Sequence, residues 1–334
     1  MKQQNNSSKS GSSASVTLPN ILTLVGLAVF GFFTYLGLSF RSPGNTGFNI
    51  LWSVLLVVVG AGLIFGAASA KGQKVDVSMW RKVEIALLSV YLLFAVLSAI
   101  FVPGFINYFQ VSSNSRTIQS RGINDINMLR NVFVKYEGDV TRAISNTRTG
   151  LRNTVLGIEC EDAVEEIKAT NGIANLDDIE NYLKDGPKKK LLGRDYEDFK
   201  AQYEAMISQW ESDIKDWSIL RLPSIPSSME EARDMIISEL KDRARTVKLP
   251  VIGMPDGRCV ITQEEQPIEF DSPRFEFGNA LSNPNAVGTP WLGYILLVVV
   301  HVLIVLTYFM TPRVNVITSV TQSGSEVDDG GQFL

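Results

Sequence analysis

Residues 16–40 read VTLPNILTLVGLAVFGFFTYLGLSF and contain no Asp, Glu, Lys or Arg. The same holds for residues 42–70, 85–115 and 277–312. A charged side chain at the centre of a bilayer costs about 2.5–3.5 kcal/mol or more, and about 20 helical residues cross the hydrocarbon core. Each run is long enough for one crossing. We therefore predict four transmembrane helices, at Leu18–Phe40, Ile50–Ala70, Val83–Val102 and Trp291–Thr311.

The rest of the sequence is organised around these spans. Residues 1–17 are rich in Ser, Asn and Gln, and residues 313–334 end in SGSEVDDGGQFL, so both tails are expected to be disordered and cytoplasmic. Residues 18–108 hold the first three spans, residues 109–290 form a polar domain, and residues 291–312 hold the fourth span. The expected fold is mainly α: a four-helix transmembrane bundle with one inserted, mostly helical extracytoplasmic domain that carries a small β-hairpin.

Basic residues indicate the orientation, because Lys and Arg concentrate in cytoplasmic loops. Residues 1–17 carry two lysines and no acid, and residues 71–82 carry four basic residues. The tail after the last span begins with Arg313. We expect both termini in the cytoplasm and the domain outside. No asparagine of the domain begins an Asn-x-Ser/Thr glycosylation sequence, which favours a bacterial inner membrane.

Apolar residues recur at helical spacing through the domain. One stripe follows a helix of about 35 residues: Ile126, Leu129, Phe133, Val140, Ile144, Leu151 and Val155. A second stripe is aromatic: Tyr196, Phe199, Tyr203, Met206, Trp210, Ile214 and Trp217. We expect the two helices to pack as an antiparallel pair. Aromatic residues at this spacing are typical of a core, and a ligand groove is the alternative.

Two more helices are predicted in the domain. The stretch Asn175–Lys184 favours a short helix. Ser227 and Glu230 have the spacing of a capping box, which predicts a helix that continues to about Val247. Its inward residues are expected to be Met235, Ile236, Leu240 and Ala244.

After this helix the pattern changes to short β-prone runs. Leu249–Gly253 and Arg258–Thr262 flank a Met-Pro-Asp-Gly sequence. Proline fixes φ and glycine accepts a positive φ, so these residues predict a turn and the runs predict a β-hairpin. Residues 263–289, rich in Pro, Asn and Glu, are expected to return irregularly to the membrane.

Cys160 and Cys259 are the only cysteines, and both lie in the domain. Paired thiols outside the cytoplasm oxidise, so we predict a disulfide that fastens the hairpin to the end of the long helix. It would close a loop of about 100 residues, which chain-entropy estimates equate with roughly 4–5 kcal/mol. Two free thiols are the alternative. Two cysteines without a histidine cannot form a zinc site.

His301 is the only histidine and falls in the middle of the last span. An ionisable group at this depth indicates a function by default. The other spans carry no carboxylate away from their ends, so structural hydrogen bonding is favoured over a role in proton or ligand binding. A single histidine also excludes nearly every Ser-His-Asp, Cys-His or multi-histidine site.

Gly62, Gly66 and Ala70 form a small-xxx-small pattern on the second span. Such a pattern lets a neighbouring helix approach closely, either within the chain or in a homo-oligomer. We interpret these three residues as a helix-packing face.

Charge and motifs narrow the function. Acids outnumber bases by 30 to 23 in residues 116–276, which argues against a nucleic-acid partner. No phosphate-binding loop, metal-ligand cluster or catalytic pair stands out, so we expect neither a cofactor nor an enzyme. The order of a short first loop and a large third one resembles tetraspanins in topology alone, without their Cys-Cys-Gly motif. A helical domain framed by membrane helices is also similar to bacterial periplasmic sensor modules, without their output domain.

The expected function is a non-enzymatic, multi-pass membrane scaffold, assembly or sensor subunit. Its partners would be other membrane or envelope proteins, with the lipid bilayer around its spans. A channel or transporter, or an accessory subunit of one, is the alternative. An enzyme that acts on lipid or cell wall is a third reading. The spans lack charged pore residues and repeated broken helices, which weighs against transport.

Overall fold

The computed structural model describes residues 18–73, 76–101, 104–158, 160–253, 259–265, 268, 270, 272–284 and 291–313, with the backbone alone at 99–101. The chain divides into two compact units. The first comprises residues 1–32, 52–102 and 295–334, and the second comprises residues 33–51 and 103–294. The expected tails, except Arg313, and the predicted Met-Pro-Asp-Gly turn lie outside the described residues.

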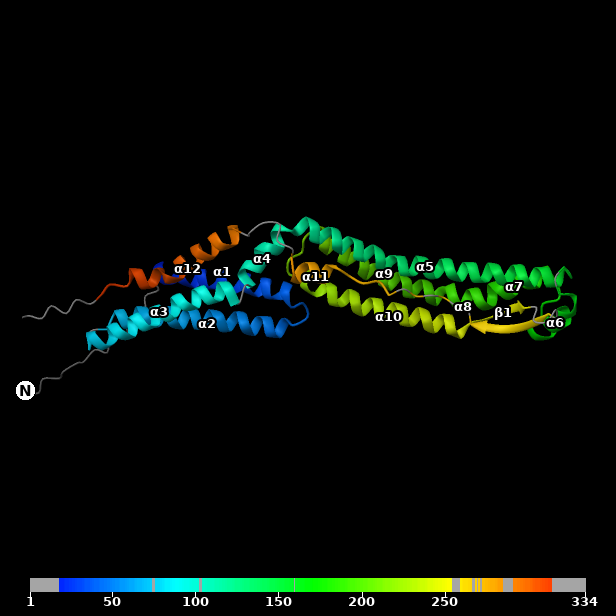
Figure 1. Ribbon diagram of the computed structural model, residues 1–334, viewed down its shortest axis with the longest axis horizontal. Coiled ribbons are helices and arrows are strands. Elements are labelled where there is room, and N and C mark those ends of the chain that lie inside the picture. Colours follow the sequence, from blue (N-terminus) through cyan, green and yellow to red (C-terminus); the bar gives the residue numbers. More distant parts are fainter. Residues whose placement is uncertain are drawn as a thin grey trace, which may run out of the picture. The chain divides into compact units, whose positions relative to one another are not determined.

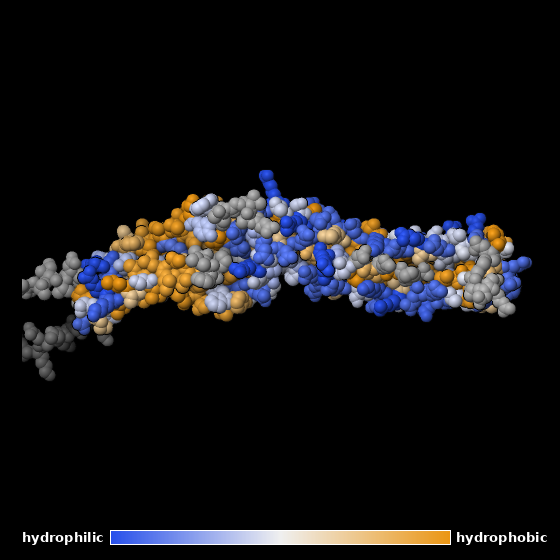
Figure 2. Space-filling view, viewed as in Figure 1, coloured by the Kyte–Doolittle hydropathy of each residue, from blue (hydrophilic) through white to orange (hydrophobic). Residues whose placement is uncertain are grey.

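Long apolar helices make up the first unit (Figure 1). They are α1 (Leu18–Arg41), α2 (Thr46–Lys71), α3 (Val77–Phe101) and α12 (Trp291–Met310). Parts of α1, α2 and α12 belong to the second unit. Within the described residues, α1, α2 and α12 are long and apolar enough to cross a membrane. Figure 2 shows hydrophobic residues across the visible face of this unit. Exposed apolar surface on this scale is typical of helices that face lipid.

The prediction of a fourth span is wrong for α3. Its described residues are not apolar enough over a sufficient length to cross a membrane. The first two turns of α3 carry Arg81, Lys82 and Glu84. The part of α3 without charged residues runs from Ile85 to Phe101, where the helix ends. That stretch is shorter than the roughly 20 residues that cross the hydrocarbon core. The charged residues in the first two turns of α3 therefore explain why three candidate spans, and not four, are found among the described residues.

Three long helices build the second unit: α5 (Ser115–Val155), α9 (Arg194–Lys215) and α10 (Ile225–Thr246). Near the start of α5, the side chain of Gln119 donates to the carbonyl of Ile214 at 2.9 Å. Farther along α5, Glu137 accepts from Lys200 of α9 at 2.6 Å. The residue number falls along α9 as it rises along α5, so the predicted antiparallel pairing is confirmed.

The predicted stripes lie in the core of the second unit. The buried members of the α5 stripe are Ile126, Leu129, Phe133, Val140 and Leu151, and those of the α9 stripe are Tyr196, Tyr203, Trp210 and Ile214. The aromatic stripe is therefore core and not groove. Phe199 and Trp217 are partly buried against this core, and Met206 is exposed, at 37%. On α10 the expected inward residues are buried except Met235, which is 46% exposed because it is offset by one residue, about 100° of helix, from the buried Ile236.

The start of α10 differs from the predicted capping box. The helix begins at Ile225 with Pro226 in its first turn, and no side chain caps it. Proline suits that position because its φ is already helical and it lacks the N–H that would remain unpaired. The Ser227 hydroxyl lies inside the first turn and donates to the carbonyl of Ser224 at 3.0 Å.

Short elements complete the second unit. They are α4 (Gly104–Ser113), a 3-10 turn (Glu161–Ala163), α6 (Val164–Asn171), α7 (Leu176–Leu183), a π turn (Lys184–Lys188), α8 (Lys189–Leu192), a second 3-10 turn (Leu222–Ser224), β1 (Lys248–Gly253), β2 (Val260–Glu265) and α11 (Phe277–Ser282). β1 and β2 pair antiparallel with Val251 opposite Thr262, which confirms the predicted hairpin. β2 extends beyond its predicted end, and α11 occupies part of the stretch expected to be irregular.

Candidate functional site

The C-terminal end of α5 carries a small substructure of its own (Figure 1). We call it the tip, and it consists of α6, α7 and the β1–β2 hairpin around the last turns of α5. Its separate apolar core is fully buried and contains Leu151, Ile167, Ile173, Ile179 and Leu183. At 1.5 Å per residue, the 41 residues of α5 place the tip about 60 Å from Ser115. The tip is thus held at one end of an elongated support.

A disulfide fastens the tip. Cys160 follows α5, Cys259 precedes β2, and their Cα atoms lie 5.6 Å apart across a separation of 99 residues. Ile252 and Ile261, one from each strand, pack against the small core of the tip. The predicted disulfide therefore joins the hairpin to the end of the long helix at the place expected from the sequence.

Large apolar side chains reach the surface beside this disulfide. Ile158 is 67% exposed, Leu156 is 48% exposed, and Val260, next to the second cysteine, is 41% exposed. We call these three residues the tip patch. They come from two chain segments that the disulfide holds together. Grouped exposed apolar side chains are typical of surfaces that bind other proteins.

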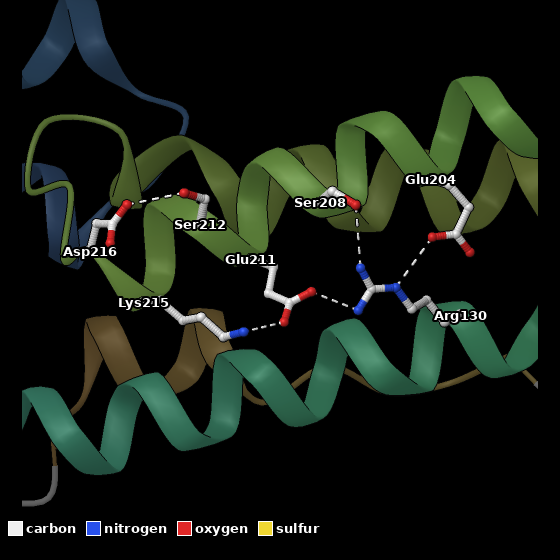
Figure 3. Close-up of polar contacts among 7 residues, drawn as sticks. All are labelled: Arg130, Glu204, Ser208, Glu211, Ser212, Lys215 and Asp216. Atoms are coloured by element: carbon white, nitrogen blue, oxygen red, sulfur yellow. Dashed lines mark hydrogen bonds and ion pairs between the residues drawn. The ribbon is translucent and has the colours of Figure 1, made fainter.

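An ion network locks α9 against α5 in the middle of the support (Figure 3). The guanidinium of Arg130 donates through Nε to Glu204 at 3.2 Å and through Nη1 to Glu211 at 2.7 Å. Its Nη2 reaches the hydroxyl of Ser208 at 3.4 Å. Lys215 also binds Glu211. Hydrogen bonds from Lys215 and Arg130 hold the pKa of Glu211 below its ordinary value.

A second link between the same helices involves Glu137. Its carboxylate accepts a hydrogen bond from Lys200 at 2.6 Å and one from the hydroxyl of Tyr196 at 2.7 Å. Burial alone would raise the pKa of Glu137, but these two donors outweigh burial and hold it below its ordinary value. The link therefore depends on an ionised carboxylate.

Asp125 of α5 ties down the segment that leads out of the domain. Its fully buried carboxylate accepts from the backbone N–H of Glu276 at 2.8 Å and of Phe277 at 2.7 Å, at the start of α11. Burial raises the pKa of Asp125 despite these bonds. A Cβ at Gly122 would meet the ring of Phe277 at 2.9 Å, so glycine is needed for this close approach.

A cavity of about 180 Å³ lies between α5 and the segment before α11. Its lining is mostly apolar and includes Met128, Val132, Tyr136 and Phe270. Ligand pockets usually measure roughly 300–1,000 Å³ and present several convergent polar groups. This cavity is smaller and carries few such groups. Among the described residues, no three His, Cys, Asp or Glu side chains gather closely enough to hold a metal ion.

In the first unit, His301 meets a partner that the sequence did not reveal. Its Nδ1 lies 2.9 Å from the hydroxyl of Tyr91 on α3, and the ring of Phe30 packs beside it at a centroid distance of 5.5 Å. The buried Nε2 has no hydrogen-bond partner among the described residues. This arrangement resembles the structural hydrogen bond favoured above.

The small-residue pattern on α2 is divided between packed and open positions. A Cβ at Gly66 would touch Leu87 of α3 at 3.2 Å, and Ala70 is buried. At Gly62, no described atom lies within 4 Å of such a Cβ. Each step of four residues turns the side-chain direction by about 40° around the helix axis. Three residues at this spacing therefore do not all face the same neighbouring helix. The packing role of Gly62 stays a prediction.

No known protein family, curated protein or solved structure matched the chain. The geometry described above is therefore the basis for assigning a function.

Proposed function

We propose that the chain is a non-enzymatic membrane scaffold, assembly or sensor subunit, and that its tip binds partner proteins of the membrane or envelope. The observation that carries this proposal is the tip patch of Leu156, Ile158 and Val260, whose apolar side chains are exposed on a disulfide-fastened support. An exposed Ile or Leu has little effect on folding when it is removed, so a grouped set of them indicates contact with another molecule.

Rigidity of the support favours the same function. The Arg130 network and the Glu137–Lys200 pair fasten α9 to α5 at two levels. A binding surface held by a preorganised support loses less entropy when it docks. The small, mostly apolar cavity beside Phe270 offers no comparable support for catalysis.

We also propose that the second unit lies outside the cytoplasm, at a bacterial inner membrane, with the C-terminus inside. The disulfide supports this placement because disulfides persist in oxidising compartments. Arg313, three residues after the end of α12, supports a cytoplasmic position for the end of that span. The basic N-terminal residues favour the cytoplasm for the N-terminus too, which requires an even number of crossings. The hydroxyl of Thr23 near the start of α1 lies 2.7 Å from that of Thr307 near the end of α12, which supports a position of both termini on the same side.

Topology reporters fused after residues 43, 150 and 334 test this placement. We expect residue 150 outside and residue 334 in the cytoplasm. The reporter after residue 43 determines the side of the N-terminus, because α1 crosses the membrane between them. An external signal at residue 43 means that the N-terminus is cytoplasmic. A cytoplasmic signal at residue 150 would refute the proposed placement of the domain.

Photocrosslinking in intact cells tests partner binding. A photoreactive residue in place of Ile158 is expected to give one or two dominant adducts. The same residue in place of Arg142, whose side chain is 74% exposed in the middle of α5, is the matched control. Adding Val260→Asp should remove the adducts. Equal adducts from both positions would contradict partner binding at the tip. Ion flux through the purified protein in liposomes would favour the channel alternative.

A further inference from the structure

The first unit contains a polar pocket of about 190 Å³ that the proposed scaffold function does not use. It lies where α2 ends, α3 begins and the chain leaves α12. The residues that carry its chemistry are Lys71, Trp80, Arg81, Glu84 and Arg313. Three elements distant in sequence therefore bring their charged ends to one place.

The single carboxylate of the pocket is already engaged. The side chain of Glu84 is 5% exposed and accepts from the Tyr308 hydroxyl at 2.7 Å and from Nη2 of Arg313 at 3.1 Å. It fixes the end of α12 and offsets only one positive charge. Two cations remain in excess.

The two remaining cations, Lys71 and Arg81, differ in how they are held. Nζ of Lys71 donates to the carbonyl of Tyr308 at 2.8 Å and lies 4.6 Å from the centre of its ring. This contact positions the ammonium group without neutralising it. Arg81 is exposed and forms no ion pair with any residue that the structure describes. Positive charge without a counterion is thus concentrated beside Trp80.

The position of the pocket indicates the ligand. α2 and α12 are both candidate spans, and both end here, so the pocket lies at the depth of lipid headgroups. Tryptophan is enriched at this depth, and arginine forks bind phosphate oxygens in pairs. A pocket of about 190 Å³ is small for a whole metabolite but suits a headgroup whose acyl chains remain outside. On α3, next to the pocket, Met79 is 54% exposed and Ile85 is 55% exposed, which offers apolar surface to those chains.

We propose that this pocket binds the phosphate of an anionic phospholipid headgroup, with Lys71, Arg81 and Arg313 as its donors. The site is independent of the tip and of the proteins that bind there. Basic residues near anionic membrane surfaces contribute enough that losing one weakens binding roughly fivefold.

Native mass spectrometry of the full-length protein, titrated with phosphatidylglycerol or phosphatidylcholine, tests the proposal. We expect preferential retention of phosphatidylglycerol and roughly fivefold weaker retention in Arg81→Gln. Arg81 has no ion-pair partner to lose, so this variant should keep its fold. Arg81→Lys should retain most of the binding. Lys82→Gln removes a neighbouring cation that does not line the pocket and should bind as the wild type does.

Three results would overturn the proposal. One is equal retention of the two lipids, and another is equal loss in Arg81→Gln and Lys82→Gln, which would indicate only a general surface charge. The third is displacement of bound phosphatidylglycerol by inorganic phosphate at millimolar concentration, which would indicate a site for free phosphate. Persistence of the lipid against inorganic phosphate supports a headgroup site.

Discussion

Replacing both cysteines by serine should cost the second unit much of its stability. The disulfide joins Cys160 and Cys259 across 99 residues, and it constrains the unfolded chain by closing that loop. The chain-entropy relation gives about 4.7 kcal/mol at 25 °C for a loop of roughly this length. A domain of this size loses about 2–4 °C of melting temperature per kcal/mol. The double variant should therefore melt roughly 10–18 °C below the wild type.

Thermal unfolding of the detergent-solubilised protein, followed by tryptophan fluorescence, measures this shift. Trp210 lies in the core of the second unit and reports its unfolding. Wild-type protein in excess reductant should approach the double variant, and reductant should not change the double variant further. A shift below about 2 °C in both comparisons would refute the reasoning, because the disulfide would then contribute less than about 1 kcal/mol to the free energy of unfolding.

Arg130→Met should lower the melting temperature by a few degrees, since it removes the ion pairs with two partly buried carboxylates and leaves Glu211 with Lys215 alone, whereas the exposed control Arg142→Gln should shift it by less than one degree. The pKa of Glu137 in the folded protein lies below its ordinary value of 4.5. Its contribution to stability is therefore present above pH 4.5 and is lost as the pH falls through the folded pKa. Melting temperatures measured in a pH series should decline below about pH 4.5, and a flat series would contradict this. Gly66→Leu should destabilise the helix bundle, because the new side chain meets a leucine of α3, whereas Gly62→Leu enters open space; equal melting temperatures for the two variants would count against the packing.

The long helices could be predicted from the sequence because a helix with one buried face needs an apolar residue at every third or fourth position. This is why the stripe of Tyr196, Tyr203 and Trp210 lies in the core, and why α5 and α9 pair. The disulfide was readable for a different reason, since two cysteines allow only one pairing.

Features decided by distant residues were not readable. The six residues of α11 are too few to show a period, and the helix is capped by Asp125, which lies 151 residues away from Glu276. Arg130 lies beside the apolar stripe of α5, where nothing local indicates that two glutamates of another helix bind it. Likewise, the pair of Tyr91 and His301 joins residues 210 apart. Local patterns predict which face of a helix is buried but not which polar groups meet there.

The hydrogen bonds from Asp125 to the start of α11 have an architectural consequence. Asp125 lies near the beginning of the long helix, and Glu276 lies near the end of the inserted sequence, so the place where the chain enters the domain is tied to the place where it leaves. A domain whose ends meet can be moved as a cassette into a loop of another protein, because its host need only bridge a short gap.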